Sequence, residues 1–238
     1  MTKSGRGRNK AGLSRHRSAN APSVRPRILI ACEGEKTEPN YFVDVRRRFE
    51  KVSDDLCVVL PECGVPMSVV RRAKKEKKAA KYEGRPFDEV WVVFDRDEHP
   101  DVENAIQMAR ANKFGIAFSN PCFELWYLLH FQNQTGFIDR HAAERTLREH
   151  IDGYDKNLKD LYATRLHDKE DEATTRAEGL QARYEKDEQD TAGKKKWSDT
   201  NPFTTVDRLL KALSEAYSEK LPQKPAPSSP CAAEDGGE

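Results

Sequence analysis

The sequence lacks any hydrophobic run long enough to cross a membrane. No stretch of its 238 residues approaches the ~18–20 consecutive apolar residues that a transmembrane helix needs. The basic N-terminus also lacks the apolar core of a secretory signal, so we expect a cytoplasmic protein without membrane contact. The five cysteines form no Cys-x-x-Cys pair, which favours reduced, mostly buried thiols over a disulfide framework or a zinc knuckle.

Acidic residues are absent from positions 1–32, which hold eight lysine and arginine residues. The net charge of the whole chain is only +1, so this asymmetry is local. A basic run of this size is normally disordered, and its commonest productive role is to contact nucleic acid; a merely solubilising tail is the alternative. Composition predicts disordered tails over residues 1–24 and 221–238.

Strand and helix patterns alternate between residues 25 and 136. Continuous apolar runs bounded by polar residues predict strands over 28–32, 56–60, 89–94 and 114–118. Helical spacing of apolar residues predicts intervening helices over 39–51, 66–82, 101–112 and 122–131. This alternation is typical of an α/β domain with a mostly parallel four-stranded sheet flanked by helices.

The strand signals stop after residue 136. Amphipathic patterns separated by polar loops predict helices over 139–150, 156–166, 172–187 and 203–219. We therefore expect the α/β domain to be followed by a helical extension over residues 137–220.

Acidic residues directly follow two of the predicted strands: Glu33 follows the first, and Asp95 and Asp97 follow the third. In open α/β sheets, ligands bind outside the carboxyl ends of the strands. Carboxylates at adjacent exits would lie ~5 Å apart, where each like-charge pair costs roughly 3 kcal/mol at an effective dielectric constant of ~20. Bound Mg²⁺ or Mn²⁺ would relieve this repulsion. Separate, solvated turns are the alternative.

A phosphate loop and an aspartyl-phosphate hydrolase fit these motifs less well. The stretch 34–37 (GEKT) is no phosphate loop, because its Gly and Lys are not adjacent and the upstream Gly is missing. An Asp-x-Asp motif also marks aspartyl-phosphate hydrolases. Such enzymes usually place it after the first strand, and Glu33 would then have no role.

Three motifs carry a resemblance to a known family: CEGEKTEPNYF at 32–42, VFDRDEH at 93–99 and SNPCFELW at 119–126. Together they resemble the RloB family, which is related to the AbiLii abortive-infection proteins and found in bacterial restriction and phage-defence loci. The resemblance spans roughly residues 25–220. It implies a Toprim-like fold in which Glu33, Asp95 and Asp97 are catalytic and bind Mg²⁺. One departure is the stretch 98–100, which stands where a glycine often follows the Toprim Asp-x-Asp.

Further residues near the strand exits are candidates for the same site. Glu124 is a candidate additional metal ligand or a first-turn glutamate favoured by the helix dipole. Glu38 is a candidate to line the site, although helix N-terminal charge is its favoured role. Ser119 and Asn120 would orient phosphate or water, or only cap the following helix. His99 is a candidate general base or a surface partner of the acids. Glu35 and Lys36 are expected to line the site.

The predicted helix over 66–82 carries seven cations. Its candidate phosphate contacts are Arg71, Arg72, Lys74, Lys75 and Lys78. A solvated helix face is the alternative. Binding through these side chains would weaken steeply with salt. No aromatic-rich base-stacking motif is present in the sequence.

The resemblance implies a Mg²⁺-dependent nuclease that cleaves phosphodiester bonds of RNA or DNA in phage defence. The chain has no phosphate-loop motif of its own, so we expect any nucleotide-driven control to come from a partner ATPase of the same locus. The alternative, from another class, is a non-catalytic nucleic-acid-binding or regulatory subunit. The oligomeric state does not follow from the sequence.

Overall fold

The computed structural model describes residues 25–49, 55–59, 64–97, 99, 101–190 and 195–217. The two predicted tails, over 1–24 and 221–238, lie outside these residues, as do Glu98, Cys63 and Cys231. Among the described cysteines, Cys32, Cys57 and Cys122 are free thiols. None of the helices in the described ranges is long and apolar enough to cross a membrane.

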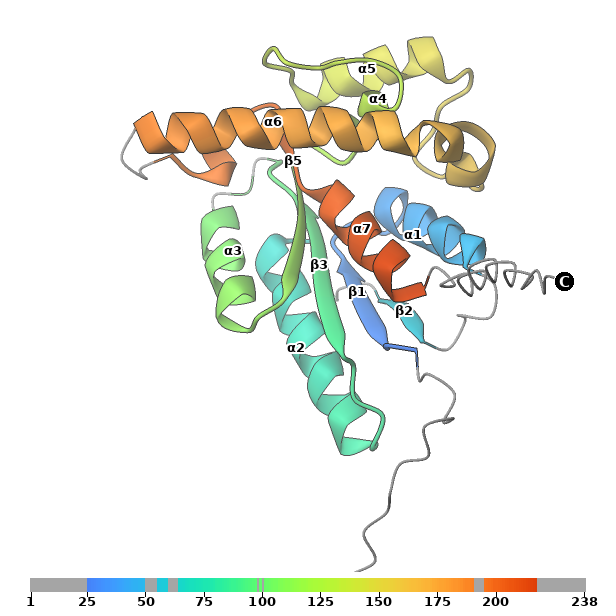
Figure 1. Ribbon diagram of the computed structural model, residues 1–238, viewed down its shortest axis with the longest axis vertical. Coiled ribbons are helices and arrows are strands. Elements are labelled where there is room, and N and C mark those ends of the chain that lie inside the picture. Colours follow the sequence, from blue (N-terminus) through green and yellow to red (C-terminus); the bar gives the residue numbers. More distant parts are fainter. Residues whose placement is uncertain are drawn as a thin grey trace, which may run out of the picture.

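A five-stranded sheet forms the centre of the protein, with the strand order β2-β1-β3-β4-β5 (Figure 1). Four strands are parallel: β1 (Ile28–Cys32), β2 (Leu56–Val59), β3 (Glu89–Asp95) and β4 (Gly115–Asn120). The short β5 (Phe203–Thr204) pairs with β4 in the antiparallel direction. The predicted α/β fold with a mostly parallel sheet is therefore confirmed, and the predicted number of strands is one too few.

Helices cover both faces of the sheet because successive side chains of each strand point to opposite sides. On one face, Leu29 and Ala31 pack with residues of α2 (Pro66–Tyr82) and α3 (Val102–Ala111). On the other, Ile28 and Ile30 pack with residues of α1 (Thr37–Arg48) and α7 (Val206–Tyr217). All five residues of β1 are fully buried, as the continuous apolar run predicts for a strand covered on both faces.

The remaining helices lie beyond the edge at which β1 and β3 end (Figure 1). They are α4 (Glu124–Leu129), α5 (Arg140–His150) and α6 (Glu170–Asp190). Short helical turns at Tyr162–Leu166, His167–Lys169 and Trp197–Asp199 connect them to their neighbours. Of the helix predicted over 156–166, only residues 161–166 are helical, and Tyr162–Leu166 form a π-helix.

The helix predicted to begin at residue 203 in fact begins at Val206. The preceding Phe203 and Thr204 form β5 instead, and both are fully buried. The Thr205 amide donates to the carbonyl of Phe118 at 2.9 Å, which holds this segment against β4. Aromatic and β-branched residues favour a strand where a neighbouring edge offers unpaired backbone groups, and here that tertiary context overrides the helical spacing.

Candidate functional site

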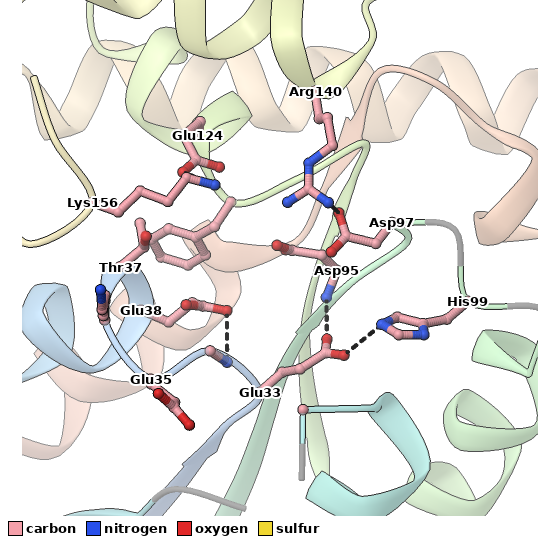
Figure 2. Close-up of a pocket in the computed structure, with 14 residues that line it drawn as sticks. Glu33, Glu35, Thr37, Glu38, Asp95, Asp97, His99, Glu124, Arg140 and Lys156 are labelled. Atoms are coloured by element: carbon pink, nitrogen blue, oxygen red, sulfur yellow. Dashed lines mark hydrogen bonds and ion pairs between the residues drawn. The ribbon is translucent and has the colours of Figure 1, made fainter.

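A cavity of about 360 Å³ lies at the carboxyl ends of β1 and β3 (Figure 2). Because these two strands are adjacent and parallel, the residues that follow them meet at the same edge of the sheet. Candidate residues from both exits and from α4 line the cavity together: Glu33, Glu35, Lys36, Asp95, Asp97, His99 and Glu124.

Glu33 and Asp95 form the floor of the cavity. The Glu33 amide donates to the carbonyl of Val93 at 2.9 Å, which continues the β1–β3 pairing by one residue. In return, the Asp95 amide donates to Glu33 Oε2 at 3.1 Å. Their residual exposures are only 7% and 9%. Asp95 Oδ1 is buried and finds no hydrogen-bond partner among the described residues, an arrangement that is costly for a carboxylate unless a ligand compensates it.

Glu38 is a further buried acid of the cavity, whereas the sequence favoured helix N-terminal charge over lining the site as its role. It lies in the first turn of α1, is 5% exposed and accepts a hydrogen bond from the Gly34 amide at 3.2 Å. A Cβ atom at position 34 would lie 2.1 Å from Glu38 Oε2. Only glycine therefore lets the loop after β1 approach this carboxyl without displacing it.

Asp97 is held in a backbone conformation that most residues avoid. Its φ of 35° is in the left-handed region, which Asp tolerates better than most residues. The Asp97 amide donates to the carbonyl of Pro121 at 3.2 Å, and Arg96 donates from its own amide to the Ser119 carbonyl at 2.8 Å. These bonds to the end of β4 and to the residue after it fix the turn that aims Asp97 into the cavity.

Two cations face the acids from the helical region (Figure 2). Arg140, the first residue of α5, lies 3.2 Å from Asp97 Oδ1. Lys156 Nζ lies 3.5 Å from Glu124 Oε1, which also accepts a hydrogen bond from the Tyr154 hydroxyl at 3.1 Å. Sequence reasoning missed both cations, because a single Arg or Lys in a polar helical segment carries no local signal of a site that is distant along the chain.

His99 contacts the acid that follows β1. Its Nε2 atom lies 3.3 Å from Glu33 Oε1. The Arg96 guanidinium holds the backbone of this residue in place by donating to the His99 carbonyl at 2.8 Å. The imidazole can therefore exchange a proton with the Glu33 carboxyl without any rearrangement of the chain.

The electrostatics of the cavity disfavour full ionisation. Burial, reinforced by Glu38 and Asp97 and opposed by the Asp95 amide and Arg140, raises the pKa of Glu33 to about 8. Burial raises the pKa of Glu38 to about 7, and burial with the nearby Glu38 and Glu124 raises the pKa of Asp95 well above its ordinary value. Without a compensating cation, part of this cluster is protonated at neutral pH.

The donor set has the chemistry that a hard divalent cation requires, since carboxylate oxygens are its preferred ligands. The buried oxygen of Asp95 that lacks a hydrogen bond is directly available to such an ion. As the side chains stand, however, no group of three or more His, Cys, Asp or Glu residues in the described ranges is placed to hold a metal ion. Glu33 and Asp97 are instead paired with His99 and Arg140, with which a metal would compete.

A family model described as RloB-like protein matches residues 28–213, a range that contains every residue lining the cavity. The chain belongs to the RloB-like family. This membership confirms the resemblance seen in the three sequence motifs and suggests a defence-related protein. No curated protein matches the chain, and no solved structure matches it.

Ser119 and Asn120 do not line the cavity of this RloB-like chain. They are the last two residues of β4 rather than the cap of α4. The Ser119 hydroxyl is fully buried and lies 3.1 Å from the Thr204 hydroxyl, so it joins β4 to β5. Asn120 donates from Nδ2 to the carbonyl of Ser198 at 3.1 Å and lines a neighbouring groove instead.

The candidate phosphate contacts on α2 lie outside the cavity. The helix begins beside the cavity, where Gly64 contributes to the lining, and runs away from it toward Tyr82 (Figure 1). Arg71, Lys74, Lys75 and Lys78 are exposed, whereas Arg72 is half-buried and lies 2.9 Å from Glu76. These side chains can reach only nucleic acid that extends over the α2 face.

Proposed function

We propose that this RloB-like protein is a Mg²⁺-dependent nuclease, with a Toprim-like site, that cleaves phosphodiester bonds of RNA or DNA in bacterial phage defence. The observation that carries the proposal is one cavity in which buried Glu33 and Asp95, together with Asp97, face Arg140 and Lys156. Carboxylates suit the cation of such a reaction, and the opposing cations suit the phosphate of its substrate.

Glu33, Asp95 and Asp97 would hold the cation, and Glu124 is the candidate for a further ligand. When bound, Mg²⁺ or Mn²⁺ supplies charge stabilisation for the oxygens of an in-line phosphoryl displacement. Two observations support this assignment: Asp95 Oδ1 is buried without a hydrogen-bond partner among the described residues, and the pKa values of Glu33 and Glu38 are raised. Both are expected of buried acids that lack a compensating positive charge.

The protein's own side chains bind the substrate and move the proton. Arg140, with its forked guanidinium, is suited to a phosphodiester oxygen, and Lys156 adds a second positive charge on the same side. His99 Nε2 and Glu33 Oε1, 3.3 Å apart, are suited to take up and release the proton of the attacking water. Control by a partner ATPase fits a chain without a phosphate loop.

The test is cleavage of end-labelled RNA and DNA by the purified chain with Mg²⁺ or Mn²⁺ and with EDTA. Asp95→Asn and Glu33→Gln are expected to abolish cleavage, because each replaces a carboxyl group that would bind the cation by a neutral amide of nearly the same size. Glu35→Gln is the matched control, since Glu35 lines the same cavity but is exposed. Undiminished cleavage by both floor variants would reject the site.

One observation favours a second function, a non-catalytic nucleic-acid-binding subunit. No three acids among the described residues are placed to hold a metal ion, and the basic side chains of Arg71, Lys74 and Lys78 on α2 are exposed. Titration calorimetry separates the two functions. Absence of heat on adding Mg²⁺ or Mn²⁺, combined with salt-sensitive nucleic-acid binding, would favour the binding subunit.

A further inference from the structure

An exposed aromatic ring lies beside the acidic cavity. Phe137, in the loop between α4 and α5, has 79% of its surface exposed. It lines a groove of about 400 Å³ together with Arg96, Asn120, Asp139 and His141. A flat apolar ring at this exposure offers one face to a planar ligand.

The groove lies next to the acidic cavity. Asp97 and Arg140 line both hollows, so the two share a wall. A strand whose phosphate lies against Arg140 would place its neighbouring base at the groove that Phe137 lines. The cavity carries the charges that a phosphodiester requires, and the groove carries an aromatic surface for the group attached to it.

The loop that bears Phe137 is fixed in place by Asn201. The Asn201 side chain accepts a hydrogen bond from the Ile138 amide at 3.0 Å and donates to the Ile138 carbonyl at 2.9 Å. It also donates to Asn120 Oδ1 at 3.4 Å. Arg96, which also lines the groove, is held by donation from Nε to the Ser198 carbonyl at 3.1 Å. The groove is thus formed before a ligand arrives, which lowers the entropic cost of binding.

We infer that this groove binds an unpaired nucleobase, stacked on Phe137, of a nucleic-acid strand whose phosphodiester lies in the acidic cavity. A base inside an intact duplex already stacks on its neighbours and cannot reach the ring, so the substrate is single-stranded or has a base turned out of the helix. The inference rests on the proposed function, which it deepens by naming the substrate class. The sequence showed no aromatic-rich motif because the groove needs only one aromatic residue, positioned by the fold.

The test measures affinity in EDTA, where no Mg²⁺-dependent cleavage occurs. The probes are fluorescently labelled oligouridylate and oligothymidylate of about 12 nucleotides, with a duplex of the same length. Phe137→Ala is expected to weaken binding of the single strands by about 10-fold, and Phe137→Trp to retain it. Tyr82→Ala is the matched control, because Tyr82 is 94% exposed at the far end of α2. The two single strands show whether the groove accepts RNA, DNA or both.

Equal affinity of wild-type and Phe137→Ala protein, an equal loss in Tyr82→Ala, or no binding of either single strand would overturn the inference. The nuclease proposal is tested separately, by measuring whether Mg²⁺-dependent cleavage occurs and whether Asp95→Asn abolishes it. Cleavage unaffected by Phe137→Ala, with unchanged affinity, rejects the base site and leaves the nuclease. Binding that depends on Phe137 without any cleavage rejects the nuclease and leaves the base site.

Discussion

Replacing Glu33 by Gln is expected to stabilise the metal-free protein, although it alters a buried residue of the cavity. Burial raises the pKa of Glu33 from an ordinary 4.5 to about 8. Gln has nearly the same shape and keeps an oxygen that accepts the hydrogen bond from the Asp95 amide. The substitution thus removes the titrating group and keeps the hydrogen bond with the Asp95 amide, while an NH2 group replaces Oε1 beside His99 Nε2.

The expected magnitude depends on pH. Above pH 4.5 the unfolded chain releases the Glu33 proton, whereas the folded chain retains it up to about pH 8. The folded state therefore binds more protons in this window, and the free energy of unfolding of the wild type falls by roughly 1.4 kcal/mol per pH unit. Glu33→Gln has no such loss. Its free energy of unfolding should exceed that of the wild type by roughly 3 kcal/mol at about pH 7 and equal it at about pH 4.

Urea denaturation in EDTA, followed by circular dichroism from about pH 4 to about pH 8.5, measures this difference. Glu35→Gln is the control, because Glu35 is exposed in the same loop, and its stability should follow the wild type throughout. Addition of Mg²⁺ should stabilise the wild type but not Glu33→Gln. A difference between Glu33→Gln and wild type that is absent or independent of pH would refute the assignment of the raised pKa to a desolvated carboxyl.

Three further outcomes are expected. Arg140→Ala should tighten Mg²⁺ binding in calorimetry, because it frees Asp97 Oδ1. The same variant should weaken nucleic-acid binding about 10-fold in fluorescence anisotropy. A gain or a loss of affinity for both ligands would contradict the assigned roles. Gly34→Ala should lower the free energy of unfolding by about 1–3 kcal/mol, since its Cβ displaces the Glu38 carboxyl. Leu213→Ala should lower the free energy of unfolding by about 2–5 kcal/mol, because Leu213 is fully buried. Its control, Lys211→Ala on the exposed face of α7, should leave the urea denaturation curve unchanged.

The sheet could be predicted because its central strands leave a strong local signal. A strand covered on both faces, such as β1, is a continuous apolar run bounded by polar residues. The meeting of Glu33 and Asp95 then follows from the parallel order of β1 and β3. The two-residue β5 left no comparable signal, because its periodicity cannot be distinguished from the start of the amphipathic α7.

The charge balance of the cavity could not be predicted from local patterns. Glu38 is buried because Gly34 approaches it closely, a contact that depends on the path of the loop after β1. Arg140 and Lys156 reach the acids only through the packing of the helical region over the end of the sheet. Sequence patterns predict which residues follow the ends of adjacent strands. They carry no information on which side chains from distant parts of the chain pack over those residues.

The division of charge between two parts of the chain has a mechanical consequence. The acids of the floor are anchored to strand ends in the core, whereas Arg140 is anchored to α5. A displacement of α5 relative to the sheet would move Arg140 away from Asp97 while Glu33 and Asp95 stayed in place. The position of α5 therefore determines how closely a positive charge approaches Asp97.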